Sequence, residues 1–208
     1  LTFDDRTRVS IPAIVPGGLL NRFSIAAFNE LWYRKAPQSR VDEPQGISQF
    51  FHPLDMVGEW NRLYGPAGML QYQIVVPFGY EGHLERVVEQ LAQARAASFL
   101  TVLKRFGAGS SGHLSFPLPG WTLTLDIPTS VRGLGPLLDE LDREIVEIGG
   151  RVYLAKDSRV SPDLIERMYP RIDEWRAVCD RVDPQRIWQS DLSRRLGLRE
   201  PHRPSSDR

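Results

Sequence analysis

The stretch Trp121-Thr-Leu-Thr-Leu-Asp-Ile127 alternates strictly between apolar and polar residues. Successive side chains of a β-strand point to opposite faces of a sheet, so this segment would present one apolar face and one polar face. The polar face carries Thr122, Thr124 and Asp126. The pattern predicts a strand of an antiparallel sheet that buries its other face in a core.

The segments on both sides of this strand complete a defined chain order. Apolar residues recur at every second position in some segments and at helical spacing in others, which separates strands from helices. The expected elements are, in order, a strand over 70–76, a helix over 82–98, a strand over 99–105, the strand 121–127, a helix over 134–148 and a strand over 151–154. This β-α-β-β-α-β order predicts an α+β fold, with a ferredoxin-like antiparallel sheet and both helices on one face.

The face of this sheet without helices would be free to meet a ligand or another domain. Polar side chains of two strands are expected to line it: Gln71, Gln73, Thr122, Thr124 and Asp126.

The rest of the chain is expected to be helical or irregular. A C-terminal helical segment follows the sheet, with Ser161 as the N-cap of its first helix, and residues 199–208 are polar and predict a disordered tail. Before the sheet, Glu30–Lys35 is compatible with a strand. Residues 51–66 are compatible with a helix and a tight Gly-Pro turn.

The composition excludes several classes of function. Lys+Arg and Asp+Glu are equal at 26 each, so there is no positive excess of the kind that nucleic-acid binders use. The single cysteine, Cys179, allows neither an intrachain disulfide nor a multi-cysteine metal site. No apolar run approaches the roughly 18 residues of a membrane span. The sequence starts at Leu1 rather than Met, which is compatible with a piece of a longer protein, and it leaves the compartment open between cytoplasm and periplasm.

The short motifs, taken alone, are weak. Gly107–Gly112 matches G-x-G-x-x-G, but prolines follow where a dinucleotide site needs a helix, so a loop between strands is expected. The four histidines lack metal-ligand spacing, and Ser110 and Ser111 have no evident base nearby. Lys156 follows the last strand, where a lysine is usually solvated.

Several segments together resemble the decaprenylphosphoryl-ribose oxidases, which are vanillyl-alcohol-oxidase-type flavoproteins related to aldonolactone oxidases. The matching segments are Glu30–Lys35, Phe51–Met56, Gly58–Arg62, Tyr64–Gly68, Leu70–Gln73, Leu114–Pro117, Pro119–Trp121, Ala155–Arg159, Met168–Arg171 and Asp173–Trp175. The resemblance covers roughly residues 10–198 and rests on many tryptophan, proline and glycine positions in order.

The resemblance implies the C-terminal half of an FAD-dependent oxidoreductase that oxidises a sugar hydroxyl: a hydride goes to the flavin while the hydroxyl proton is removed. Residues 1–150 would be part of a substrate-binding (cap) domain, and residues 151–198 would return to an FAD domain that binds most of the cofactor. The chain alone would then be inactive. The implied partners are a sugar or polyprenyl-phosphate-sugar substrate, an epimerase or reductase subunit and, peripherally, a membrane.

The resemblance also implies roles for single residues. Lys156 matches the family's essential active-site lysine, and Tyr153 matches a tyrosine that contacts the flavin. The positions that match the substrate pocket are Tyr33, Gln71, Gln73, Leu100, Val102, Lys104, Phe106, Thr122 and Thr124.

The pocket departs from the mycobacterial pattern at two of these positions. Thr122 stands where those enzymes have asparagine, and Thr124 stands where they have the cysteine that covalent inhibitors attack. The departure leaves the substrate open. An aldonolactone-oxidase-like activity and a ferredoxin-like binding module without redox chemistry both remain as alternatives.

Overall fold

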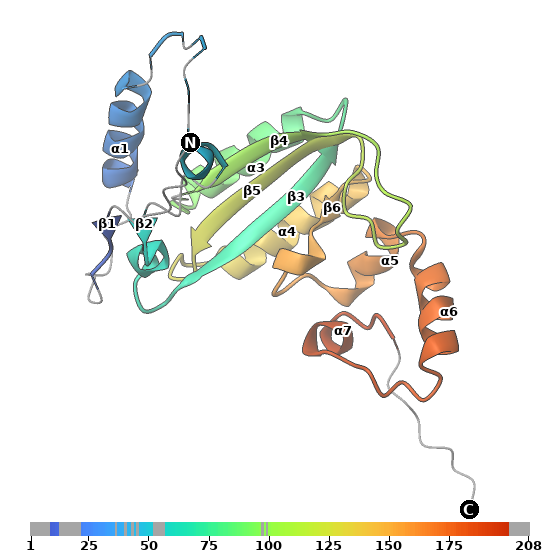
Figure 1. Cartoon of the computed structure of the whole chain (residues 1–208). Coiled ribbons are helices and arrows are strands. Elements are labelled where there is room, and N and C mark those ends of the chain that lie inside the picture. Colours follow the sequence, from blue (N-terminus) through green and yellow to red (C-terminus); the bar gives the residue numbers. More distant parts are fainter. Residues whose placement is uncertain are drawn as a thin grey trace, which may run out of the picture. The chain divides into compact units, whose positions relative to one another are not determined.

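The computed structural model describes residues 9–12, 22–35, 37–39, 41–42, 44, 46–51, 57–96, 98 and 100–199. These residues form two compact units (Figure 1). The first unit comprises Leu1–Leu70, Arg95–Phe99 and Ile127–Val131, and the second comprises Gln71–Ala94, Leu100–Asp126 and Arg132–Arg208. Each unit is described by itself.

A four-stranded antiparallel sheet dominates the second unit. Its strand order is β4 (Thr101–Phe106), β5 (Gly120–Pro128), β3 (Met69–Pro77) and β6 (Arg151–Val152). Helices α3 (Gly82–Gln93) and α4 (Leu134–Glu147) lie on one face of the sheet (Figure 1). The predicted α+β fold is confirmed, and the strand order is that of the split βαβ arrangement.

The core lies between the sheet and these two helices. Ile74 of β3 and Leu138, Leu141 and Ile145 of α4 have no exposed surface. Tyr72 marks this face of β3, because its hydroxyl donates a 2.9 Å hydrogen bond to Asp142 of α4. The neighbours Gln71 and Gln73 therefore lie on the opposite face, as the alternation of the strand predicts.

Helix α4 ends as the glycine pair at 149–150 predicts. Gly149 has a positive φ of 79°, and its N–H donates to the carbonyl of Val146. The N–H of Gly150 donates to the carbonyl of Ile145 at 2.8 Å, which completes a Schellman motif. The chain then enters β6 at Arg151, after this three-residue turn over 148–150.

The C-terminal part of the second unit is helical, as expected. A 3-10 turn over Pro162–Leu164 leads into α5 (Ile165–Met168), and α6 (Ile172–Val182) and α7 (Asp191–Arg195) follow. Ser161 is the N-cap with Pro162 directly after it, as predicted, but its side chain bonds Asp163 and caps no backbone N–H. One detail was wrong: the last strand ends at Val152, and residues 154–156 form a 3-10 helix. The expected disordered tail, 199–208, was wrong at its first residue, because Arg199 pairs with Asp180 and Asp183; residues 200–208 lie outside the described residues.

The first unit pairs β1 (Val9–Ser10) in parallel with β2 (Val57–Gly58). It also contains α1 (Arg22–Lys35), α2 (Ile47–Phe51) and a 3-10 helix over Trp60–Tyr64, after which Gly65 turns the chain with a φ of 71°. The strand proposed for Glu30–Lys35 was wrong, because this segment is the last part of α1. Glu30 and Arg34, four residues apart, form a 2.6 Å ion pair that supports the helix.

Among the residues that the structure describes, no helix is both long and apolar enough to cross a membrane.

We expect that Gly120→Ala destabilises the chain by about 3 kcal/mol, because overpacking against fixed backbone has no cheap relief. An added Cβ at position 120 would lie 2.2 Å from the carbonyl oxygen of Val76 in the neighbouring strand. Gly82→Ala is the matched control, since nothing lies within 4 Å of its added Cβ. Urea unfolding followed by circular dichroism measures both variants, and equal stabilities would contradict the close strand approach.

Candidate functional site

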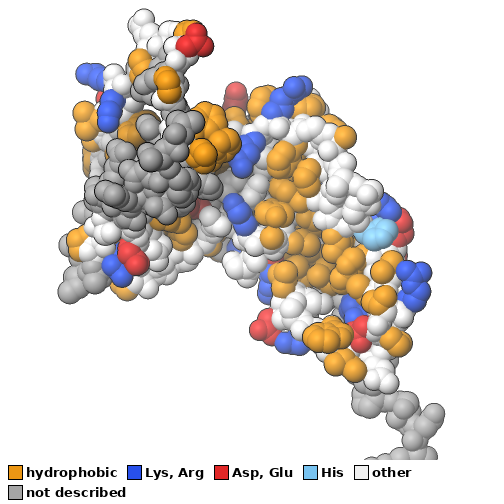
Figure 2. All heavy atoms as spheres, in the orientation of Figure 1, with side chains coloured by type: hydrophobic (Ala, Val, Ile, Leu, Met, Phe, Trp, Pro, Cys, Tyr) orange, Lys and Arg blue, Asp and Glu red, His pale blue; other side chains and the backbone are white. Residues whose placement is uncertain are grey.

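The helix-free face of the sheet in the second unit carries a ladder of polar side chains. The amide of Gln71 donates to Asp126 at 2.9 Å, and that of Gln73 donates to Thr122 at 3.0 Å. Both bonds join β3 to β5. No helix of this unit covers the face, and apolar side chains gather over β3 and towards β6 beside it (Figure 2).

The register of β4 adds three further predicted residues to this face. Val102 is paired with Thr124, Lys104 with Thr122 and Phe106 with Gly120. Residues directly opposite each other in an antiparallel pair share a face. Val102, Lys104 and Phe106 therefore lie on the same face as the two threonines. Leu100 precedes β4, and its carbonyl accepts a 3.2 Å bond from the N–H of Asp126.

An aromatic cluster closes one end of the ladder. The ring of Phe116, from the loop after β4, lies 5.8 Å from Phe106 in edge contact and 4.6 Å from Tyr153. The N–H of Tyr153 donates to the carbonyl of Gln73 at 2.9 Å, which fixes the tyrosine beside β3. Tyr153 is thus brought to the predicted pocket residues.

The loop at 107–119 is irregular, as its prolines predict, and it is tied to itself rather than open. The N–H of Ser110 donates to the hydroxyl of Ser115 at 3.1 Å. An added Cβ at Gly109 would lie 2.5 Å from the carbonyl oxygen of Pro117. The second glycine of the G-x-G-x-x-G pattern therefore permits a close contact within the loop.

Lys156 is the last residue of the 3-10 helix Leu154–Lys156, and its side chain is half-buried. Its ammonium acts electrostatically on Asp126. Burial raises the pKa of Asp126 above its ordinary value, while the hydrogen bond from Gln71 and the charge of Lys156 lower it. The charge of Lys156 thus acts on the ionisable residue of the polar ladder. Asp126 is the ionisable residue of this ladder to which sequence reasoning assigned no role.

Two other residues near this site were missed. Phe116 carried no signal beyond the Leu114–Pro117 motif. Arg151 is half-buried beside β3, where Val75 is its cross-strand partner. Its guanidinium donates to the carbonyl of Ser115 and lies 5.5 Å from the ring of Tyr169. Burial lowers the pKa of Arg151. A cation of this kind favours an anionic or oxygen-rich neighbour.

Tyr33 is the one predicted site residue outside the second unit. It lies on α1 with 79% of its surface exposed. Its membership of the pocket remains a prediction.

The aromatic residues Phe116 and Tyr153, whose rings are tilted by 31° to each other, and the polar ladder would suit one part of FAD, its isoalloxazine ring. They offer the ring an apolar surface and hydrogen-bonding groups at its edge. A pyrophosphate needs a helix N-terminus after a glycine-rich turn, and the described residues 107–119 lack one. No group of three or more His, Cys, Asp or Glu among the described residues could hold a metal ion.

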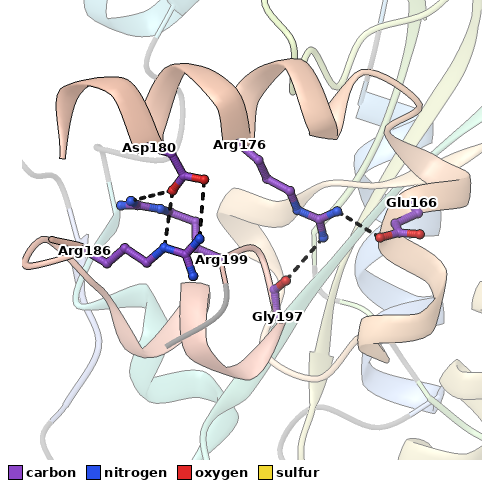
Figure 3. Close-up of a pocket in the computed structure, with 6 residues that line it drawn as sticks. All are labelled: Glu166, Arg176, Asp180, Arg186, Gly197 and Arg199. Carbon is purple, nitrogen blue, oxygen red and sulfur yellow. Dashed lines mark hydrogen bonds and ion pairs between the residues drawn. The ribbon is translucent and has the colours of Figure 1, made fainter. Parts of the chain in front are cut away.

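A cavity of about 340 Å³ lies elsewhere, between α6 and the C-terminal segment (Figure 3). Its charged lining is paired internally: Arg176 with Glu166 at 2.9 Å, and Asp180 with Arg199 at 3.0 Å and Arg186 at 3.3 Å. The hydrogen bond from Arg199 holds the pKa of Asp180 below its usual value. These pairs fix the segment after α6.

Replacing Asp126 tests the buried carboxyl. Because its folded pKa is raised, the native chain holds the proton more tightly than the unfolded chain, and the unfolding free energy falls as pH rises through that interval. We expect that Asp126→Asn gains stability relative to the natural chain, with a larger gain at about pH 7 than at about pH 4. Asp191→Asn is the control, because that side chain is 99% exposed. A gain equal at both pH values in urea titrations would disprove the assignment.

Known proteins are similar in sequence to this chain over most of its length. No protein-family model matches the chain. The chain is 46% identical over 198 residues, 95% of its length, to decaprenylphosphoryl-β-D-ribose oxidase of Mycolicibacterium smegmatis. It is 40% identical over 188 residues, 90% of its length, to an uncharacterized protein in the mprA 5′ region of Streptomyces coelicolor.

The chain spans 43% of the first relative and 50% of the second, so about half the length of each. The resemblance that the motifs indicated is confirmed: over nearly its whole length, this chain is homologous to part of a decaprenylphosphoryl-β-D-ribose oxidase.

Proposed function

We propose that this chain is the substrate-binding part of an FAD-dependent oxidoreductase that oxidises a hydroxyl of a sugar, with a polyprenyl-phosphate-linked ribose as the first candidate substrate. The observation that carries the proposal is the polar ladder on the helix-free face, with the charge of Lys156 acting on its Asp126. The homology to an oxidase of that substrate class supports it.

FAD, when bound, supplies the acceptor for the hydride. The residues of this chain hold and orient the substrate. The amides and hydroxyls of Gln73, Thr122 and Thr124 offer donors and acceptors that match sugar hydroxyls. The ammonium of Lys156 binds the oxygen that reacts and stabilises negative charge on it. Lys104 suits a phosphate group as a point charge.

In this proposal the aromatic cluster around Phe116 also controls access of water to the face. Tyr153 and Phe116 exclude water from one end of the face, which strengthens every electrostatic contact there. Thr124 offers a hydroxyl in place of the thiol of the mycobacterial pattern, so the pocket keeps a hydrogen-bonding group and lacks a strong nucleophile.

The proposal extends to the division of the chain. Residues 1–150 contribute the substrate-binding domain, and residues 151–198 pack against a flavin-binding part that holds most of the FAD. The support is an exposed apolar group near the C-terminus: Val182, Ile187 and Trp188 are 72%, 70% and 83% exposed. Apolar residues that are exposed next to one another commonly mark a contact surface.

The flavin absorbance of the native protein tests the class of function, whether the flavin-binding part lies in the same polypeptide or in a partner chain. Loss of the flavin absorbance when a polyprenyl-phosphoryl-ribose is added, which reports reduction of the flavin, supports the proposal. Bleaching by a free sugar lactone alone would favour the aldonolactone-oxidase-like alternative, and a protein without flavin would favour the binding module.

Truncating Lys156 should abolish substrate oxidation. A preorganised cationic donor is worth on the order of 3 kcal/mol, so Lys156→Ala should slow flavin reduction by about a hundredfold or more while the fold and bound flavin persist. Arg143→Ala is the control, because it removes an exposed cation from α4. Stopped-flow absorbance is the measurement. A rate within roughly threefold of the natural protein would place Lys156 outside the chemistry.

A further inference from the structure

The turn that follows Lys156 is built around the carboxylate of Asp157. One oxygen of Asp157 accepts hydrogen bonds from the backbone N–H groups of Arg159 at 3.0 Å and Val160 at 2.8 Å. The other oxygen accepts from Arg195 at 2.5 Å. The side chain of Asp157 is only 2% exposed. A buried carboxylate with these partners fixes the path of the chain directly after Lys156.

Arg195 reaches this turn from α7, 38 residues further along the chain. A second nitrogen of its guanidinium donates to the carbonyl of Val160 at 3.1 Å, so the planar fork holds two points of the turn. Helix α7 is itself well anchored. Ser190 caps it by accepting from the N–H of Ser193 at 3.1 Å, and Leu196 behind it is 1% exposed.

The same turn is held from the opposite side by Arg159. Its guanidinium donates to Asp142 of α4 at 2.5 Å, to the carbonyl of Leu138 at 3.0 Å and to Asp139. The turn after Lys156 is thus clamped between α4 and α7. The backbone N–H of Lys156 donates to the carbonyl of Tyr153, and the clamped turn follows directly, so this clamp bears on the placement of the lysine side chain.

We propose that Arg195, acting through Asp157, is a positioning residue for Lys156, so that the C-terminal helix α7 sets the reach of the lysine towards Asp126. This inference rests on the proposed function of Lys156. A buried ion pair is not needed for stability alone, since apolar replacements of such pairs are often neutral or stabilising. The directional hydrogen bonds of the Arg195–Asp157 pair instead fix one conformation of the turn.

The kinetic test uses Arg195→Gln and Arg195→Lys in the native flavin-loaded protein, with Arg194→Gln as the matched control. Arg194 is the neighbouring residue on α7, and it pairs only with the surface residues Asp191 and Gln189. We expect Arg195→Gln to lower kcat about tenfold or more with KM nearly unchanged, because small misplacements of a reacting group are costly. Arg195→Lys should restore part of the rate, and Arg194→Gln should have no effect.

A structural readout separates this inference from the proposed function. Lys156 lowers the pKa of Asp126, so Lys156→Met should raise that pKa, and Arg195→Gln should move it in the same direction. The carboxyl resonance of Asp126 followed by NMR over pH measures both. If Lys156→Met oxidises substrate normally, the proposed function fails, and this titration alone decides whether Arg195 positions the lysine.

Three results would overturn the inference: kcat of Arg195→Gln within threefold of the natural protein, an unchanged Asp126 titration, or equal losses in Arg195→Gln and Arg194→Gln. If Arg195→Gln does not fold, Asp157→Asn replaces it, because the asparagine keeps an acceptor for the two backbone N–H groups. The same three results, measured on Asp157→Asn, would then overturn the inference.

Discussion

The buried carboxylate of Asp142 joins the three parts on which the second unit depends. It accepts hydrogen bonds from Tyr72 of the central strand β3 and from Arg159 of the turn after β6, and it is itself part of α4. Burial raises the pKa of Asp142, and Arg159 opposes that rise. Burial and the same carboxylate raise the pKa of Tyr72. Removing Tyr72 or Arg159 would leave the buried carboxylate of Asp142 with one hydrogen-bond donor fewer. Removing one partner of a buried charge in this way is strongly destabilising.

This arrangement explains why the two faces of β3 have different chemistry. The helix face uses one tyrosine to bind the α4 network, and the neighbouring glutamines on the other face bind across to β5. Tyr72 thus has its partner in α4, while Gln71 and Gln73 have theirs in β5. The helix-free face can therefore hold Gln71, Gln73, Thr122 and Asp126 in fixed orientations before any ligand arrives, which is the condition for selective binding of a hydroxyl-rich molecule.

Sequence periodicity predicted the order of the sheet because β5 alternates between apolar and polar residues and because α3 and α4 each bury one apolar stripe, although both faces of β3 and β5 are mostly buried. It failed for Glu30–Lys35, where Leu31, Trp32 and Tyr33 suit a strand but the helix α1 formed. The same alternation placed the glutamines and threonines on one face. It could not place Lys156 near Asp126 or Arg195 against Asp157, because pairs 30 and 38 residues apart leave no periodic trace.

The exposed Trp188 lies on a segment that is already ordered. Asp183 accepts hydrogen bonds from the backbone N–H groups of Ile187 at 2.9 Å and Trp188 at 3.1 Å, and Arg199 pairs with the same carboxylate. The backbone beneath the indole is therefore fixed while its ring faces solvent. A partner surface that covers this ring therefore does not have to order the backbone beneath it, so binding costs little conformational entropy there. Most of the area buried on binding can then contribute to affinity.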